Sequence, residues 1–512
     1  MQLTGLLSLS LASAFALTGS FVVPTSANEP PVPTPLEPRP LGPAGTPPPE
    51  SGSQGAAGAR RPDIVVFYLD DFAPRPRSLW DDPERTPNLA RFVNRGTRFS
   101  NSIVSTPLCG PSRAGLLTGR YGHNNGVIAN DVAPYSADND IAEKLNKVGY
   151  HTVYVGKHIN RLQDARPTRL QMDKLATWWD EFDVMWEDQG KFYDWTQYRK
   201  DEDSVYFGTD PGAHSSRVAA ERAIEHIEAT PADEPLFLFI SLVDGHIPVT
   251  PMQRHVDDPA CADFEPWQGP AFNEEDVSDK PSHIQARPRL PMESYDLVPR
   301  CEQSLTSDWV VGKVTRALRD ADRLEDTLQV LTADNGWLMG DHRIEGKTFP
   351  YATPVPTYVR WPAVLGGRKR ILEEPITNLD WLPTFCDLAG CGVPNADGTS
   401  ILPLITGAAD QLDRKFLFVE LLYDNVRYPD DPRARPAYTG VETTLGYSDT
   451  RWAFTRYSNG EAELYNLSED PYRLENLYGR DGYGKVTRDL QKLHKSVKQA
   501  DDVEWLDTPS FG

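Results

Sequence analysis

Short apolar runs separated by longer mixed segments dominate the pattern of the chain. Four runs are rich in Val, Ile, Phe, Tyr and Leu and lack clean alternation, which is typical of strands covered on both faces. These runs are Ile64–Leu69, Thr152–Val155, Leu236–Leu242 and Leu328–Thr332. Helical patterns lie between them, for example over Ser216–Glu228 and Ser304–Ala321. The alternation predicts an α/β domain with a largely parallel sheet.

From about Lys415 onward the pattern changes to shorter, antiparallel-looking strands. We expect these strands at Phe416–Glu420, Trp452–Tyr457 and Ala462–Tyr465. Asn459-Gly460 between the last two is a strong hairpin turn. The segment Thr487–Lys498 has a helical pattern. The sequence therefore predicts a large domain over 62–414 and a smaller C-terminal α+β domain over 415–512.

The N-terminal segment differs from the rest of the chain. An apolar stretch from Leu3 to Val23 ends in small residues, which predicts a signal peptide over 1–27. A membrane anchor is the competing interpretation, but the stretch is short for a span and is broken by Ser and Thr. Residues 28–61 are rich in Pro, Gly, Ala and Ser and are typical of a linker. We expect a secreted, cell-surface or periplasmic protein with no stable membrane span.

The balance of charge narrows the class of partner. The 512 residues carry 52 Lys and Arg against 74 Asp and Glu, a net charge of −22. This acidity argues against non-specific binding to nucleic acid or to anionic membranes. An anionic substrate would therefore need a local basic pocket.

Polar side chains follow each of the four apolar runs directly. They are Asp70-Asp71, Gly156-Lys157-His158, Asp244-Gly245-His246 and Asp334-Asn335-Gly336. Any one of these segments alone would be an ordinary exit from a strand. Because open α/β sheets bind ligands at the carboxyl ends of their strands, four such exits together predict one shared site.

The run Cys109-Gly110-Pro111-Ser112-Arg113 opens a further helix-like stretch that Gly119 closes. Proline suits the first turn of a helix, and glycine suits the position after its end. Residue 109 would then lie at a helix N-terminus, which favours an anion. The alternative is a buried structural cysteine.

This run resembles the signature of the type I sulfatases, in which a formylglycine-generating enzyme reads Cys-x-Pro-x-Arg and oxidises the cysteine to formylglycine. The resemblance extends from about Arg61 to Tyr478. It implies an alkaline-phosphatase-like large domain, with a mixed, mainly parallel sheet between helices, that hydrolyses sulfate monoesters. The substrate would be a sulfated small molecule or glycan, and the maturation enzyme would be a partner.

The resemblance also assigns a metal site. Paired carboxylates and an Asp-Asn pair offer hard oxygen ligands, which suit Ca²⁺ or Mg²⁺ and not zinc. The matching positions in the family bind one divalent cation, usually Ca²⁺. They are Asp70, Asp71, Cys109 as formylglycine, Asp334 and Asn335.

The family mechanism implies roles for the remaining polar residues. Hydrated formylglycine 109 would attack sulfur, while Arg113, Lys157 and Lys347 neutralise the sulfate oxygens. His246 would protonate or hydrogen-bond the leaving alcohol.

Two departures from the family stand out. Gly245 replaces the first proline of the family's Pro-His-x-Pro segment. Many members have Lys-x-His, whose histidine is the base for sulfate expulsion, but here His158 is adjacent to Lys157 and would point away in an extended segment. The identity of the base stays open.

The substrate is the least constrained feature. Gly156-Lys157-x-x-Asn160 and the aromatic stretch from Trp178 to Tyr193 look like the N-acetylglucosamine-6-sulfatase branch. The aromatic side chains would either stack on sugar rings or form core. The alternatives are an arylsulfatase, a phosphonate or phosphate monoester hydrolase of the same superfamily, and a non-catalytic sulfoglycan-binding protein.

Four cysteines remain once Cys109 is set aside, an even number that fits two disulfides in an exported chain. Three pairings are available, and four free thiols are the alternative. We favour Cys386–Cys391, which is local, with Cys261–Cys301, which would close a Pro-rich insertion.

Overall fold

The computed structural model describes residues 61–72, 80–160, 167–186, 190–264, 268–291, 297–423 and 435–497. All of them belong to one compact unit, Arg60–Gly512. The signal peptide and almost all of the linker that the sequence predicts lie outside the described residues. Within the described part, no helix has both the length and the apolar character needed to cross a membrane.

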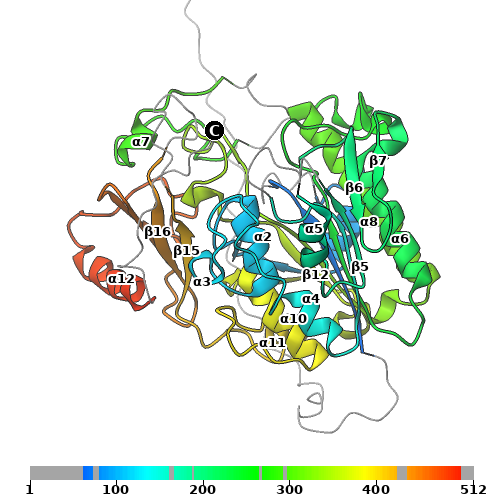
Figure 1. The fold of residues 1–512 in the computed structure, drawn as a ribbon. Coiled ribbons are helices and arrows are strands. Elements are labelled where there is room, and N and C mark those ends of the chain that lie inside the picture. Colours follow the sequence, from blue (N-terminus) through cyan, green and yellow to red (C-terminus); the bar gives the residue numbers. More distant parts are fainter. Residues whose placement is uncertain are drawn as a thin grey trace, which may run out of the picture. The chain divides into compact units, whose positions relative to one another are not determined.

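A ten-stranded sheet forms the centre of the large domain (Figure 1). Its strands in spatial order are β13 (Arg370–Leu372), β2 (Thr97–Phe99), β12 (Thr357–Arg360), β9 (Thr327–Ala333), β1 (Asp63–Leu69), β8 (Leu236–Ser241), β4 (His151–Gly156), β5 (Glu181–Met185), β6 (Trp195–Arg199) and β7 (Val205–Phe207). The neighbours from β9 to β5 are parallel, whereas β12, β6 and β7 run antiparallel to the strands that they pair with. The prediction of a mixed, mainly parallel sheet is confirmed.

Helices cover both faces of this sheet. Val65 and Phe67 of β1 pack into a core with α1 (Pro87–Asn94), α6 (Ser215–Ala229) and α8 (Leu297–Asp320). Val66 and Tyr68 point the other way, into a core with α2 (Cys109–Thr118), α4 (Ile141–Asn146) and α10 (Trp381–Ala389). Both sets of side chains are buried, which explains why the strands show no alternation of apolar and polar residues.

The predicted helices are present with shifted ends. α6 begins and ends within one residue of the predicted bounds, but α8 begins at Leu297, well before the expected Ser304. Pro299 is tolerated there because it lies in the first turn. Both predicted disulfides are confirmed. Cys261–Cys301 joins the second turn of α8 to the chain 40 positions earlier, and Cys386–Cys391 links the last turn of α10 to the chain just beyond the helix.

The C-terminal domain is a four-stranded antiparallel sheet with one helix against it (Figure 1). The elements are β15 (Phe416–Leu421), β16 (Tyr438–Thr443), β17 (Trp452–Tyr457), β18 (Ala462–Asn466) and α12 (Gly484–Ser496). The predicted hairpin between β17 and β18 and the smaller α+β domain are confirmed. The apolar pattern does not predict β16, whose segment is interrupted by Gly440 and contains two threonines.

The remaining α-helices and strands are short. They are β3 (Ser102–Ile103), α3 (Gly122–Asn125), α5 (Arg169–Leu175), α7 (Ser282–Gln285), β10 (Leu338–Met339), β11 (Glu345–Gly346), α9 (Pro362–Leu365), β14 (Ile376–Thr377) and α11 (Leu402–Thr406).

Candidate active site

Helix α2 places Cys109 at the carboxyl edge of the central strands. The helix begins at Cys109, and Gly119 ends it in the left-handed region with a φ of 64°. The amide of Gly110 donates a hydrogen bond of 2.8 Å to Oδ1 of Asn130. The Cys109 side chain is completely buried. The helix therefore has the bounds that Pro111 and Gly119 predict, with residue 109 in its first turn.

A cluster of acidic groups surrounds the cysteine. One ligand atom each from Asp70, Asp71, Cys109 and Asp334 lies within 4.8 Å of all the others, and all four residues are buried. Asp70 follows β1 and Asp334 follows β9, and these two strands are parallel neighbours in register. The fold thus brings together side chains that are more than 260 positions apart, as the strand-exit pattern predicts.

The cluster fits a hard cation. Oδ2 of Asp71 and Oδ1 of Asn335 are buried and accept no hydrogen bond from the described residues. An unsatisfied buried acceptor costs about 1–3 kcal/mol, and a bound cation would remove that cost. Carboxylate and amide oxygens are the donors that Ca²⁺ and Mg²⁺ prefer.

Three cationic side chains enter the same cluster. Arg113 Nε lies 2.9 Å from Oδ2 of Asp334, and Lys157 Nζ is paired with Oδ2 of Asp70. Lys347 Nζ lies 2.5 Å from Oδ1 of Asp71 and 2.6 Å from Cys109 Sγ. We call the seven residues Asp70, Asp71, Cys109, Arg113, Lys157, Asp334 and Lys347 the ionic cluster. Its three carboxylates and three cations compensate one another, so each buried charge has a partner.

This environment sets the protonation of the groups. Burial would raise the pKa of Asp70, but Lys157 and other nearby cations hold it well below its usual range. Burial, together with the charge of Asp70, raises the pKa of the Cys109 thiol. Because only a thiolate is a strong sulfur nucleophile, the unmodified cysteine in this cluster is a poor one.

His246 lies at the edge of the ionic cluster. A ring nitrogen of His246 is within 4.8 Å of the ligand atoms of Asp70 and Cys109. Its Nδ1 lies 2.6 Å from the carbonyl oxygen of Ile247. A carbonyl can only accept, so Nδ1 carries a hydrogen and Nε2 is the unprotonated nitrogen of the neutral ring. Burial and the positive charge of Lys157 lower the pKa of His246, which favours that neutral form.

His158 lies outside the ionic cluster. Its buried ring packs among three aromatic rings, with centroid distances of 5.8 Å to Tyr135 and 5.1 Å to both Tyr154 and Phe182. We call these residues and Trp179, which packs on Tyr154, the aromatic cluster. His158 thus points away from Lys157, as its adjacent position predicts.

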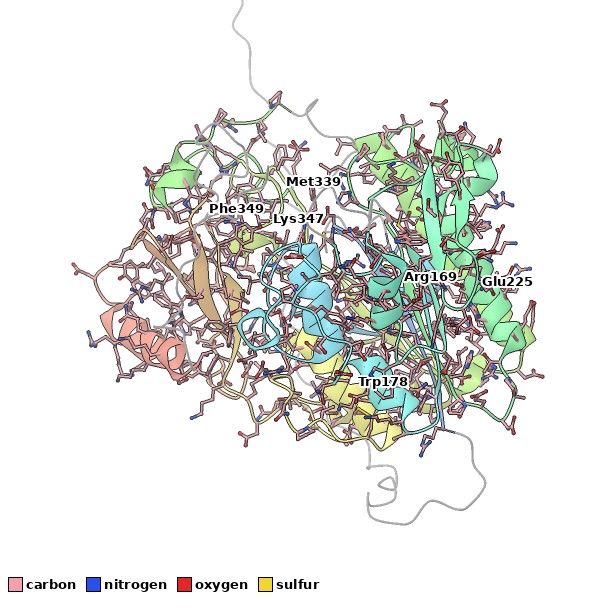
Figure 2. All side chains as sticks on the ribbon, in the orientation of Figure 1. Arg169, Trp178, Glu225, Met339, Lys347 and Phe349 are labelled. Carbon is pink, nitrogen blue, oxygen red and sulfur yellow. A yellow bond between two sulfur atoms is a disulfide. The ribbon has the colours of Figure 1, made fainter. Side chains whose placement is uncertain are left out.

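The aromatic stretch is largely core. Trp179 and Phe182 are buried in the aromatic cluster, so the interpretation of these side chains as a sugar platform is wrong. Trp178 is partly buried and carries the Lys147 ammonium 4.7 Å from its ring centroid. In Figure 2 Trp178 lies well below Lys347 in the view, beside the helix that Figure 1 labels α4.

The support of Lys347 was missed in the sequence analysis. Lys347 follows the small hairpin of β10 and β11, beside Met339 and Phe349 in Figure 2. At the tip of this hairpin, His342 Nδ1 lies 2.6 Å from Oε2 of Glu274. The Arg343 guanidinium donates to the main-chain carbonyls of Glu274, Glu275 and Arg287. These contacts join segments about 60–70 positions apart, so no short sequence motif predicts them.

Comparison with known proteins agrees with this architecture. The family described as Sulfatase matches residues 62–391, and the family described as N-sulphoglucosamine sulphohydrolase, C-terminal, matches residues 340–500. The first match covers more than half of the chain. The chain therefore belongs to the sulfatase family, and it is a sulfuric ester hydrolase.

Individual relatives are distant but cover most of the chain. An N-acetylglucosamine-6-O-sulfatase of Bacteroides thetaiotaomicron is 24% identical and matches over 86% of this chain and 87% of its own. An ulvan-active sulfatase of Formosa agariphila is 23% identical over 86% of this chain and 82% of its own. A solved complex with the substrate D-glucosamine-2-N,6-O-disulfate has a TM-score of 0.70 at 19% identity, covering 87% of this chain and 99% of that one. The solved structure shows the fold alone.

Proposed function

We propose that this protein is an exported, formylglycine-dependent sulfatase that removes the 6-sulfate of N-acetylglucosamine or of a closely related amino sugar. The observation that carries the formylglycine is the position of Cys109, which is buried in the first turn of α2 among the ligand atoms of three carboxylates, with the Lys347 ammonium 2.6 Å from its sulfur. The motif around Cys109 and the predicted signal peptide support maturation and export.

The cation in this proposal is Ca²⁺, with Mg²⁺ as the alternative. Asp70, Asp71, Asp334 and Asn335 would hold it, together with an oxygen of residue 109 after conversion. Because the charges of the ionic cluster already compensate one another, a bound divalent cation supplies the net positive charge that an incoming sulfate ester needs.

The chain's own residues then bind and orient the ester. Arg113 is fixed through Nε to Asp334 and through Nη1 to the Lys157 carbonyl and the Ser241 hydroxyl, which leaves Nη2 without a hydrogen bond within the described site. Arg113 Nη2, Lys157 and Lys347 would neutralise the sulfate oxygens. Formylglycine at 109, once hydrated, would supply the oxygen that displaces the sugar alcohol from sulfur. The negative charge of the bound ester favours a protonated His246 ring, which would give its Nε2 proton to the departing oxygen. Loss of the proton of the second hydroxyl at residue 109 would then expel sulfate and regenerate the aldehyde.

The 6-sulfate preference rests on the relatives and on Asn160. N-acetylglucosamine-6-sulfatases are among the similar proteins, including the human one at 24% identity. Asn160 lies three positions after Lys157, and its Oδ1 is buried and accepts no hydrogen bond from the described residues. An amide so placed suits a sugar hydroxyl or acetamido group, because hydrogen-bonded contacts discriminate more strongly than apolar fit.

A substrate panel tests the proposal. The protein, produced with a formylglycine-generating enzyme, is assayed for sulfate release from N-acetylglucosamine 6-sulfate, a 2-O- and a 4-O-sulfated sugar, and an aryl sulfate. Aryl phosphate and phosphonate esters test the related hydrolases. We expect the highest kcat/KM for the 6-sulfated amino sugar. A higher kcat/KM for another sulfated sugar would contradict the proposed specificity, and a higher value for phosphonate would contradict the proposed reaction.

The variant Asn160→Ala tests whether Asn160 recognises the sugar. It should lower kcat/KM for the sugar sulfate by about tenfold or more and leave the aryl sulfate nearly unchanged. Asn395→Ala, at an exposed position, is the matched control and should change neither value. Equal losses on both substrates would assign Asn160 to the sulfate step or to structure.

A further inference from the structure

The turn that carries His246 differs from the proline-bounded segment of the family. Gly245 has a φ of 107°, whereas proline is fixed near −65°. A Cβ at this position would lie 1.9 Å from the carbonyl oxygen of Asp70, so no other residue fits without moving the site. Glycine is therefore required by this backbone, and the stiffness that a proline would give must come from elsewhere.

The first turns of α8 supply that stiffness. Oε1 of Gln303 accepts a hydrogen bond of 2.8 Å from the Gly245 amide. Nη1 of Arg300 donates to the Gly245 carbonyl at 3.1 Å. The Ser307 hydroxyl donates to Oδ2 of the neighbouring Asp244 at 2.9 Å. Positions 300, 303 and 307 are spaced three and four apart, so they share one face of the helix.

The same helix face also holds the chain beyond the histidine. The amide of Met252 donates to Oγ1 of Thr306 at 3.1 Å. The Arg300 guanidinium lies 5.1 Å from the ring centroid of Trp337, and the disulfide of Cys301 ties this part of α8 to Cys261. Both the entrance to the His246 turn and its exit are thus fastened to a single rigid element.

We propose that Arg300 and Gln303 are positioning residues that set the His246 ring at the leaving oxygen of the ester. They bind both main-chain polar groups of the residue that precedes His246. Without them the turn keeps its glycine but loses the two hydrogen bonds nearest to His246, and the ring would no longer meet the departing oxygen at hydrogen-bond distance. This inference rests on the proposed function, because it takes His246 as the group that assists the leaving alcohol.

The role has a kinetic signature. A phenolate with a strongly electron-withdrawing substituent leaves without assistance, whereas a poor leaving group such as a sugar alkoxide needs a proton or a hydrogen bond. Misplacing His246 should therefore cost more as the leaving group becomes more basic. A loss of folded enzyme, or a general disturbance of the ionic cluster, would lower all rates by the same factor.

The test uses a series of substituted phenyl sulfates and N-acetylglucosamine 6-sulfate with the full-length, converted enzyme. For Gln303→Leu and Arg300→Met we expect kcat/KM to fall by about tenfold or more with the most basic leaving group and by less than about threefold with 4-nitrophenyl sulfate. Arg300→Lys keeps a cationic donor and should recover most of the loss. Arg316→Met, at an exposed position of the same helix, is the matched control and should leave all rates unchanged.

The outcomes separate this inference from the proposed function. Equal losses across the series, or no loss, would overturn the positioning role while the wild-type rates uphold the sulfatase. A converted wild type that releases no sulfate from any ester would overturn the proposed function itself. If Gln303→Leu, at a buried position, does not fold, Arg300→Met at a partly exposed position gives the same readout.

Discussion

Lys157 and His158 are neighbours in the chain, and both are buried, yet their side chains lie in two different environments. The Lys157 ammonium enters the ionic cluster and pairs with Asp70, whereas the His158 ring enters the aromatic cluster. β4 ends at Gly156, and the two residues that follow it place their side chains in different surroundings.

One face of this segment thus contributes to the candidate active site and the other to the stability of the core. In the ionic cluster every charge is buried, or nearly so, and is stabilised by an opposite charge, an arrangement that is costly to break. In the aromatic cluster, burial of apolar surface and ring packing stabilise the fold, and their contribution to the free energy of unfolding is spread over many contacts. Substitutions in the first should remove activity, and substitutions in the second should mainly change stability.

Lys157→Met should have the largest effect of the substitutions that compare the two clusters. In the proposed function it removes a cation that would neutralise the sulfate oxygens, so we expect kcat/KM to fall by about 10³-fold. It also leaves Asp70 buried with less compensation, which should lower the free energy of unfolding by about 3–5 kcal/mol. Steady-state kinetics and urea unfolding measure the two effects. Lys174→Met, at an exposed position, is the control. A variant with more than a tenth of the wild-type activity would contradict the assignment of Lys157.

Metal removal should have the next largest effect. A cation held by the carboxylates of the ionic cluster would contribute several kcal/mol to transition-state stabilisation, so dialysis against a chelator should cost about 10²-fold in rate. Added Ca²⁺ or Mg²⁺ should restore the rate, and zinc should not. Full activity in protein shown to be metal-free by elemental analysis would refute the cation.

His158→Phe should be nearly silent in catalysis. A catalytic base contributes about 10²–10⁴-fold, whereas we expect less than about threefold loss of kcat because this ring lies outside the ionic cluster. The free energy of unfolding should change by an amount typical of a volume-conserving core change, about 1.5 kcal/mol or less. A hundredfold loss of kcat in a folded variant would identify His158 as the base after all.

The last expected effect depends on pH and concerns stability, with no expected effect on the rate of the reaction. Asp140 is buried beside the aromatic cluster, where Tyr135 donates a hydrogen bond of 2.8 Å to it. Burial raises the pKa of its carboxyl to about 7. The unfolded chain ionises near pH 4, so it loses this proton first, and stability should fall as pH rises from about 4 to 7.

Asp140→Asn removes that titration and still caps α4, where Asp140 accepts from the Glu143 amide. The variant should lose less stability than the wild type between pH 4.5 and 7, as measured by thermal unfolding at several pH values. Parallel curves for the two proteins would show that Asp140 does not carry the effect.

The parts of the site that the sequence predicts are those whose position is set locally. Cys109 and Arg113 lie one turn apart on α2, and Asp70, Lys157 and Asp334 follow strands that are recognisable from their apolar runs. Parallel pairing then brings the strand ends together. Strand order predicts that the residues after these strands share one site, and the resemblance to the sulfatase signature adds Cys109 and Arg113 to it.

The residues that support the site could not be predicted in this way, because their contacts are between distant parts of the chain. Glu274 and Arg343 hold the hairpin that ends near Lys347, and Arg300 and Gln303 hold the turn of His246. Each contact joins segments more than 50 positions apart in the chain, and no sequence motif indicates that they lie close together. Gly245 was the one local signal, and its meaning depends on a backbone φ and on the closeness of Asp70, which only the folded chain provides.

The most direct test of the account measures conversion and activity together. Preparations produced with graded amounts of formylglycine-generating enzyme are digested, and mass spectrometry gives the fraction of the peptide with aldehyde or its hydrate at residue 109. Sulfate release per mole of protein is measured on the same samples. The account predicts a rate proportional to the converted fraction, falling to zero for the free thiol and for Cys109→Ala. Full activity in protein that carries only the thiol, or none in fully converted protein, would contradict it.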